Sequence, residues 1–343
     1  MTGTSNKTKI QTIQKLSQLK LDLPNCVFIY DKNLLKTSAK KWIQSCPISL
    51  GVVAGEELKT IQSFEKVLVQ VFKLASHIEL SRLTFVSVGG GSVGDFVGFL
   101  ASVYKRGAGL VHVPSTWLAA VDSAHGGKTA LNIQSYKNQI GTFYPAQKIF
   151  LVEELLKSQP TERVFEAYPE FFKIALIEGG VLWKKVSQVK KLDHSVLWKL
   201  LPAAIQAKYK VVAKDPFEKT GLRAHLNLGH TLGHVFESVQ KTPHGIAVGQ
   251  GLQWAIHLSY QQGLLSAEKF REIVFSTGYQ FLPQVQFEEK ITSSIFLKTL
   301  LKDKKMTSAS EVYFIFVTAP GKTLRKKIST QELTDFYKDT FLD

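Results

Sequence analysis

Cysteine is scarce in this sequence, and its two thiols, Cys26 and Cys46, form no CxxC pair. Two cysteines are too few for a disulfide framework, so we expect free thiols in a reducing compartment. No stretch approaches the ~18 consecutive apolar residues of a membrane span. The polar N-terminal segment also lacks the apolar core and cleavage site of an export signal. These absences exclude a disulfide scaffold and a membrane protein, and they predict a cytoplasmic location.

Acidic residues are outnumbered: 28 Asp and Glu stand against 43 Lys and Arg, which gives a net charge of +15. A charge of this size indicates nucleic acid, an acidic surface or an anionic small molecule as partner. The chain lacks zinc-finger spacing and an aromatic-rich RNA-binding signature. We therefore expect an anionic small-molecule substrate and no nucleic acid, with most lysine-rich stretches on solvated surface.

The length of 343 residues predicts about two domains. Apolar strand patterns begin near residues 26, 49, 83 and 109, and helical patterns, including one at 32–44, lie between them. This alternation predicts a mainly parallel sheet with helices on its faces. Residues 1–24 read as a ragged helix or tail. From about residue 151 helical patterns dominate, apart from a β-like stretch at 312–319.

We therefore expect an α/β, Rossmann-like domain at residues 1–153. A mainly α-helical domain should follow at 154–343.

A glycine-rich turn follows the third predicted strand. Gly89, Gly91 and Gly94 fit the pattern GxGxxG at the start of a helix, where backbone amides can receive a pyrophosphate. A tight turn alone can show the same pattern, but its place in a strand-to-helix unit favours a dinucleotide site. Asp95 is suited to bind a hydroxyl group or to serve as N-terminal helix charge.

The segment Arg223–His244 concentrates polar side chains in an apolar setting. His230 and His234 lie four residues apart on one helical face, a spacing that suits a metal ion and also a hydrogen-bonded pair of core histidines. His244 follows Pro243 and can supply a third imidazole. The only local carboxylate is Glu237, so a further ligand must come from elsewhere in the chain.

A second polar cluster surrounds a double glycine. Asp122, Lys128, Lys137 and Asn138 can hold a phosphate or carboxylate, although a surface loop has a similar composition. Arg106 follows a predicted helix, where it is either a C-terminal helix charge or an anion ligand.

Five motifs together resemble the 3-dehydroquinate synthases, within the sugar-phosphate cyclases, and the resemblance extends from about Val27 to Val317. These motifs are GGGSVGDFVGF, VPSTWLAAVDSAHGGKTALN, YKNQIGTFY, GLRAHLNLGHTLGH and HGIAVG. The resemblance implies a homodimeric, NAD- and metal-dependent lyase of the shikimate pathway. Its substrate would be a seven-carbon sugar-acid phosphate. The implied reaction is transient oxidation, phosphate elimination, reduction, ring opening and aldol closure.

The resemblance also implies roles for individual residues. The metal, zinc or another divalent ion such as cobalt, would be held by Glu170, His230 and His244. The substrate and its reaction would involve Asp122, Lys128, Asn138, Lys173, Lys208, Arg223, Asn227 and His234, with Arg106 reaching the partner subunit's cavity. NAD would be held by Asp31, Glu56, Lys59, Gly89, Gly90, Gly91, Ser92, Asp95, Ser115, Thr116, Lys128 and Lys137.

Three departures from the family pattern stand out. Ile246 replaces the glutamate of the usual HGEAV motif. One residue is inserted between Asp215 and Gly221, so the assignment of Lys208 depends on where that gap is placed. A further site lysine is either Lys304 or Lys305.

Other functions remain open from the sequence. A different sugar-phosphate cyclase would share most motifs. A metal-dependent polyol dehydrogenase would share the glycine-rich turn and the paired histidines, but it would reduce NAD stoichiometrically. A basic binding protein without activity is supported only by the charge and by Ile246. Within the favoured function, we expect His234 to meet the substrate and not the metal.

Overall fold

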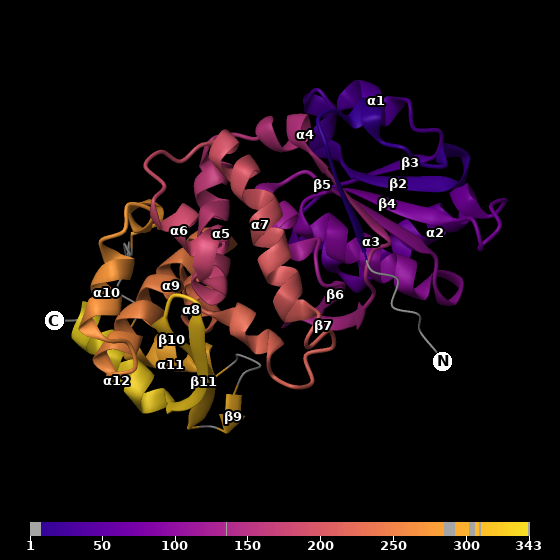
Figure 1. Ribbon diagram of the computed structural model, residues 1–343. Coiled ribbons are helices and arrows are strands. Elements are labelled where there is room, and N and C mark those ends of the chain that lie inside the picture. Colours follow the sequence, from indigo (N-terminus) through magenta and orange to yellow (C-terminus); the bar gives the residue numbers. More distant parts are fainter. Residues whose placement is uncertain (1–7, 135, 285–291, 302–305, 309, 342–343) are drawn as a thin grey trace. The chain divides into compact units, whose positions relative to one another are not determined.

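The computed structural model describes residues 8–134, 136–284, 292–301, 306–308 and 310–341. The chain divides into two compact units, residues 1–160 and 161–343 (Figure 1). The expected boundary after residue 153 falls at the start of helix α4 (Glu153–Lys157), which belongs to the first unit. Leu155 of α4 is buried in the same core cluster as the sheet strands, which explains why the unit extends past that helix.

A six-stranded sheet with the order β1-β8-β5-β4-β2-β3 forms the centre of the first unit. Every neighbouring pair is parallel, so the predicted parallel α/β fold is confirmed. The strands are β1 (Lys9–Ile13), β2 (Cys26–Asp31), β3 (Ser49–Val52), β4 (Thr84–Gly89), β5 (Gly109–Pro114) and β8 (Lys148–Val152). The remaining elements are η3 (Lys32–Lys36), α1 (Lys40–Gln44), η4 (Glu56–Lys59), α2 (Ile61–Ala75), α3 (Gly91–Val103), η5 (Tyr104–Arg106), the π-helical turn η6 (Ala119–Ser123), and the hairpin β6 (Lys128–Ile133) and β7 (Tyr136–Phe143).

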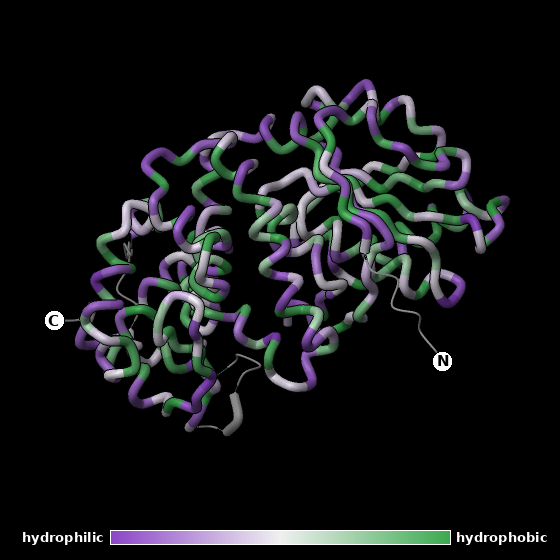
Figure 2. Tube along the Cα trace, viewed as in Figure 1, coloured by the Kyte–Doolittle hydropathy of each residue, from purple (hydrophilic) through white to green (hydrophobic). Residues whose placement is uncertain are grey.

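Buried apolar side chains explain why these segments form this sheet. Strands β2, β4 and β8 are nearly continuous buried runs, which is typical of parallel strands covered on both faces. Figure 2 shows hydrophobic residues along these strands. Helix α2 buries Val67, Val71 and Ala75, which are spaced four apart on one face.

The expectation of a ragged helix or tail at residues 1–24 was wrong in part. Residues 9–13 form β1, an edge strand in parallel register with β8, where Lys9 pairs with Lys148. Its sequence KIQTI is largely exposed and lacks the apolar pattern of the inner strands. Backbone pairing with a distant strand therefore defines β1, and side-chain hydropathy does not reveal it.

The single helix predicted over 32–44 is also wrong. The chain forms η3 and then the short helix α1, with a break at Thr37. The Thr37 hydroxyl donates to the Leu34 carbonyl at 2.8 Å and accepts from the Ala39 amide at 3.2 Å. Such local side-chain bonds compete with helical backbone bonds, which accounts for the break.

The second unit is mainly helical, as predicted, and includes a small antiparallel sheet in the order β11-β10-β9. Gly179, with φ 69°, separates α5 from α6 where the sequence showed one continuous pattern. Its elements are α5 (Glu162–Glu178), α6 (Gly180–Ser187), α7 (His194–Val212), η7 (Arg223–Asn227), α8 (His230–Gln240), α9 (His244–Gln261), α10 (Ala267–Val274), α11 (Ser293–Leu300), β9 (Met306–Ser308), β10 (Glu311–Ala319), β11 (Lys322–Ser329) and α12 (Thr330–Phe341). Among the described residues, no helix combines the length and apolar character needed to cross a bilayer.

We expect neither cysteine to react with a thiol reagent in the folded protein. Both are buried and free, and burial raises the pKa of Cys26 to about 11 and that of Cys46 to about 12. Because only the thiolate is nucleophilic, little reactive species is present at pH 8. Titration with a chromogenic disulfide should release no thiolate from native protein and two equivalents after unfolding in guanidinium. Rapid reaction of the native protein would contradict this expectation.

Candidate active site

Three residues from different helices form a group with metal-ligand chemistry in the second unit. Glu170 lies within α5, whereas His230 and His244 are the first residues of α8 and α9. One potential ligand atom from each lies within 4.8 Å of the others. Two imidazole nitrogens and one carboxylate oxygen are a donor set that suits zinc and leaves a coordination position open.

The environment of Glu170 fits a bound cation. Its side chain is 2% exposed, and its Oε1 has no hydrogen-bond partner in the described part of the chain. That oxygen lies 3.6 Å from His230 Nε2, while Oε2 pairs with the ammonium of Lys173, one helical turn later and also 2% exposed. An unpaired buried carboxylate oxygen is costly, and a divalent ion would satisfy it.

Hydrogen bonds at Nδ1 orient both histidines of the group. His230 Nδ1 lies 3.3 Å from the Leu228 carbonyl oxygen, and His244 Nδ1 lies 2.9 Å from Glu237 Oε2. A proton on Nδ1 donates to these oxygens and leaves Nε2 available as the metal ligand. Glu237, which the sequence offered only as a nearby carboxylate, therefore orients the His244 imidazole.

His234 lies beside this group without being one of its three members. Its ring centre is 5.7 Å from that of His230 and 6.5 Å from that of His244. The group of potential ligand atoms found among the described residues is Glu170, His230 and His244. The i, i+4 spacing on α8 therefore brings His234 near the centre, and its expected contact with substrate stays a prediction.

Close packing of α9 on α5 places His244 next to Glu170. A Cβ atom at Gly245 would lie 1.7 Å from the Glu166 carbonyl oxygen, so only glycine permits this approach. The next residue, Ile246, is half-buried. Where the resemblance implies a carboxylate, an apolar side chain therefore lies two residues after His244.

A buried aspartate organises the turn that precedes Arg223. Asp215 Oδ2 accepts from the Arg223 amide at 3.1 Å, and Oδ1 accepts from the amides of Lys219 at 2.7 Å and Thr220 at 3.1 Å. Burial alone would raise the pKa of Asp215, but these backbone donors outweigh it and lower the pKa to about 2. The Arg223 guanidinium in turn donates to the Pro216 carbonyl at 2.8 Å.

No sequence pattern indicates this role for Asp215, because the amides that it binds belong to the backbone of a turn. Two further predicted site residues of the second unit lie on elements that contact α5. Lys208 is buried on α7, and Asn227 ends η7; both α7 and η7 contact α5, the helix that carries Glu170. Lys304 and Lys305 lie outside the described residues.

In the first unit, four predicted site residues form a polar network around one buried lysine. Lys59 Nζ donates to Asp95 Oδ2 at 2.7 Å and to Asn138 Oδ1 at 2.5 Å. Glu56, on the same 3-10 turn as Lys59, accepts from the side chain of Asn132 at 2.7 Å. Burial raises the pKa of Asp95, and the charge of Lys59 opposes that rise. Asn132 was not among the predicted site residues.

The glycine-rich turn joins β4 to α3, as the sequence predicted, and two other segments reach it. The Ser115 amide donates to the Gly89 carbonyl at 2.9 Å, and a Cβ atom at Gly90 would lie 3.2 Å from Thr116. Ser92 Oγ accepts from the Gly55 amide at 3.0 Å, which links the start of α3 to η4. Backbone amides at the start of α3 are thus presented beside the ends of β4 and β5, where a dinucleotide phosphate can bind.

The other predicted residues of this unit occupy separate positions. Asp122 lies in the π-helical turn η6, and its charge contributes to the raised pKa of Asp95. Asp31 ends β2, and its carboxylate accepts from the Asn33 amide at 2.9 Å. Lys128 and Lys137 are exposed on the β6–β7 hairpin. Arg106 is exposed after α3 in a left-handed conformation, with φ 75°.

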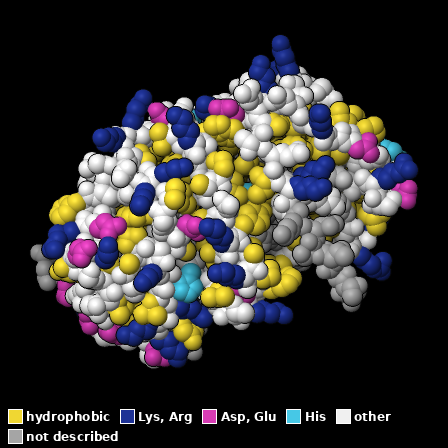
Figure 3. Space-filling model, in the orientation of Figure 1, with side chains coloured by type: hydrophobic (Ala, Val, Ile, Leu, Met, Phe, Trp, Pro, Cys, Tyr) yellow, Lys and Arg dark blue, Asp and Glu magenta, His cyan; other side chains and the backbone are white. Residues whose placement is uncertain are grey.

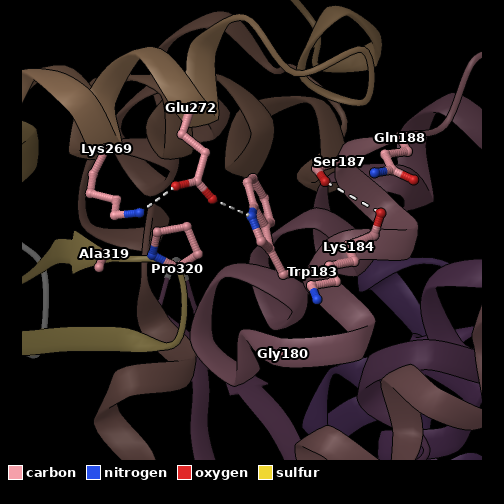
Figure 4. Close-up of a pocket in the computed structure, with 9 residues that line it drawn as sticks. All are labelled: Gly180, Trp183, Lys184, Ser187, Gln188, Lys269, Glu272, Ala319 and Pro320. Carbon is pink, nitrogen blue, oxygen red and sulfur yellow. Dashed lines mark hydrogen bonds and ion pairs between the residues drawn. The ribbon is translucent and has the colours of Figure 1, made fainter.

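A cavity of about 370 Å³ in the second unit contains none of the predicted site residues (Figure 4). In Figure 4 the Trp183 indole donates to Glu272 at 3.0 Å, and Lys269 donates to the same carboxylate at 2.8 Å.

On the face drawn in Figure 3, lysine and arginine side chains are spread over the surface and do not gather in one patch.

Comparison with protein families and known proteins places these sites in context. Residues 49–166 match the family model described as 3-dehydroquinate synthase N-terminal, and residues 167–306 match the one described as 3-dehydroquinate synthase C-terminal. The 3-dehydroquinate synthase of Francisella tularensis subsp. holarctica is 37% identical over 291 residues, which are 82% of this chain and 79% of that protein.

Solved structures with the same fold include two cyclases. A 2-deoxy-scyllo-inosose synthase complexed with carbaglucose-6-phosphate, NAD+ and Co2+ has a TM-score of 0.83 at 21% identity over 96% of each chain. A 2-epi-5-epi-valiolone synthase from Streptomyces hygroscopicus with NAD+ and Zn2+ has a TM-score of 0.82 at 18% identity, covering 97% of this chain and 96% of that one. At these identities the likeness establishes the shared fold.

Proposed function

Because this chain belongs to the 3-dehydroquinate synthase family, we propose that it converts 3-deoxy-D-arabino-heptulosonate 7-phosphate into 3-dehydroquinate and phosphate. The chain is then a phosphate-eliminating lyase of aromatic amino acid biosynthesis that uses NAD and a divalent metal. The observation that carries the proposal is the group of buried Glu170, buried His230 and half-buried His244 beside Lys173, in a chain whose two halves both match the family.

In the second unit, Glu170, His230 and His244 would hold the metal. When bound, the ion would polarise a substrate hydroxyl or carbonyl oxygen as a Lewis acid. The ammonium of Lys173 adds a positive charge beside the ligands, and it can donate to a substrate oxygen that approaches the ion. Arg223, held by Asp215, and Lys208 are cations that suit the carboxylate or phosphate of the substrate.

In the first unit, the glycine-rich turn and the network around Lys59 would hold NAD. When bound, the nicotinamide would accept a hydride from the substrate and return it within the same turnover. The amides at the start of α3 suit the pyrophosphate, and the exposed carboxylate of Glu56 suits the hydroxyl groups of a ribose. Asn138, exposed on β7 and bonded to Lys59, would meet the substrate.

Phosphate release should require only catalytic amounts of NAD, because the hydride that is removed is also returned. The purified protein, zinc and the seven-carbon phosphate would be incubated with NAD at a small fraction of the substrate concentration. We expect many equivalents of phosphate per NAD and no accumulation of NADH absorbance.

NADH formed in proportion to product would contradict this result and favour a polyol dehydrogenase. Phosphate release from another sugar phosphate, with none from the seven-carbon acid, would favour a different cyclase. The fold shared with 2-deoxy-scyllo-inosose synthase makes that second candidate worth the comparison.

The proposal includes a homodimer in the cytoplasm. The resemblance implies the dimer, with Arg106 contributing to the partner's site. The two buried free thiols support a reducing compartment. Sedimentation of the wild type and of Arg106→Ala, together with their activities, would test the dimer and the role of Arg106.

A further inference from the structure

Asn132 contacts both Glu56 and Asn138. The proposed function assigns NAD to Glu56 and the substrate to Asn138. Asn132 belongs to β6 and is 7% exposed, whereas Glu56 and Asn138 are both exposed. Its amide nitrogen donates to Glu56 Oε2 at 2.7 Å, and its amide oxygen accepts from the backbone N–H of Asn138 at 2.9 Å. One buried side chain therefore connects a proposed NAD ligand to a proposed substrate ligand.

The bond to Asn138 constrains an unusual backbone. Asn138 has φ 55°, in the left-handed region that few residues other than glycine adopt readily. Its side-chain oxygen then accepts from Lys59, which lies on the same 3-10 turn as Glu56. The contacts form a closed circuit, from Glu56 through Asn132 and Asn138 to Lys59 and back along the chain.

We propose that Asn132 is a positioning residue that couples the NAD side chain Glu56 to the substrate side chain Asn138. An amide is suited to this task because it donates and accepts at the same time while carrying no charge. When NAD holds Glu56 in one orientation, the amide of Asn132 is fixed, and with it the backbone of Asn138. The inference rests on the proposed function, since that function assigns the two ligands.

Two substitutions distinguish the two hydrogen bonds of Asn132, which we call the Glu56 arm and the Asn138 arm. Asn132→Asp keeps an oxygen for the Asn138 amide but places a carboxylate against Glu56. We expect the Kd for NAD to rise about ten-fold, with the KM for the sugar phosphate at saturating NAD changed less than about two-fold. Asn132→Ala removes both arms, so both constants should rise about ten-fold.

A donor-acceptor exchange tests the Glu56 arm directly. In the double variant Glu56→Gln with Asn132→Asp, the new glutamine amide can donate to the new carboxylate, and the pair keeps its net charge. The Kd for NAD of the double variant should be no higher than that of Glu56→Gln alone. An increase equal to the product of the two single effects would overturn the coupling.

Asn25→Asp is a matched control, because Asn25 also donates to a carboxylate, that of Asp22 at 2.8 Å, but on the exposed surface. It should leave both constants unchanged. Metal content, set by residues of the second unit, should be normal in every variant and reports correct folding of that unit. A merely structural role for Asn132 would lower thermal stability while leaving the NAD Kd of the folded protein unchanged, which would overturn the inference.

Calorimetry measures NAD binding without turnover, so the two failures are distinguishable. If the wild type releases phosphate from the seven-carbon acid and the Asn132 variants bind NAD normally, this inference fails and the proposed function stands. If no phosphate is released but the NAD Kd follows the expected pattern, the proposed function fails and the Glu56 arm stands.

Discussion

Alanine at His244, His230 or Glu170 should abolish stoichiometric metal binding, whereas alanine at His234 should leave the metal in place. Each of the first three contributes one atom to a group within 4.8 Å, and a site of three protein ligands cannot hold zinc tightly with two. His234→Ala should instead turn over slowly, since an imidazole beside the metal can donate to the substrate or carry a proton. Elemental analysis of the dialysed proteins gives the metal content.

Glu170→Ala should also destabilise the fold. It removes the carboxylate that pairs with Lys173, and an ammonium left buried without its counter-ion costs about 3–5 kcal/mol. Glu237→Gln should have a smaller effect. Loss of the orienting bond to His244 should weaken metal affinity about 10–100-fold without removing a ligand. Loss of zinc from His234→Ala, with zinc retained by His244→Ala, would make the pair on α8 the true site.

Elements with strong apolar patterns could be predicted from the sequence, and elements defined by distant pairing could not. Strands β2, β4 and β5 are buried apolar runs, and they appear where their residues indicated. Strand β1 exists because its backbone pairs with β8, more than a hundred residues later, and its exposed side chains carry no sign of that pairing. Thr37 broke a predicted helix through bonds that periodicity does not reveal.

The same distinction applies to the candidate site. Residue spacing alone drew attention to His230 and His234, which share a helical face. The grouping of His230 with His244 and Glu170 depends on how three helices pack, and the contact of Gly245 with the Glu166 carbonyl is part of that packing. The family resemblance supplied this set, and the spacing of the residues did not determine it.

Residues that act through other residues are the hardest to predict from one sequence. Asn132 reaches Glu56 across 76 positions, and Asp215 accepts from three backbone amides of a turn. Neither bond requires a recognisable partner side chain at a fixed spacing. Their roles depend on hydrogen bonds that only the folded chain forms.

Asp215→Asn should therefore reduce activity strongly, although Asp215 is not expected to touch the substrate. The carboxylate accepts three backbone N–H groups, including that of Arg223, and an amide would turn a donor toward one of them. A displaced guanidinium misplaces the substrate's anionic group, so we expect kcat/KM to fall roughly 10–100-fold. Steady-state kinetics at pH 7 measures the loss. Unchanged kinetics would show that the turn holds Arg223 without this carboxylate.

The pH dependence of unfolding supplies an independent test of the same residue. Because folding lowers the pKa of Asp215 to about 2, from an ordinary value of about 3.8, its charged form stabilises the folded chain. That contribution is fully present above about pH 4 and is lost as the pH falls through about 2. Asp193→Asn is a control for the kinetics, because it removes a carboxylate that accepts from the Val196 amide at the start of α7 and should change stability but not the KM.

The stability difference between wild type and Asp215→Asn in denaturant titrations should be constant from pH 7 to about 4 and shrink below it. A difference that grew as the pH fell would mean that the carboxylate is not held in its charged form by these amides.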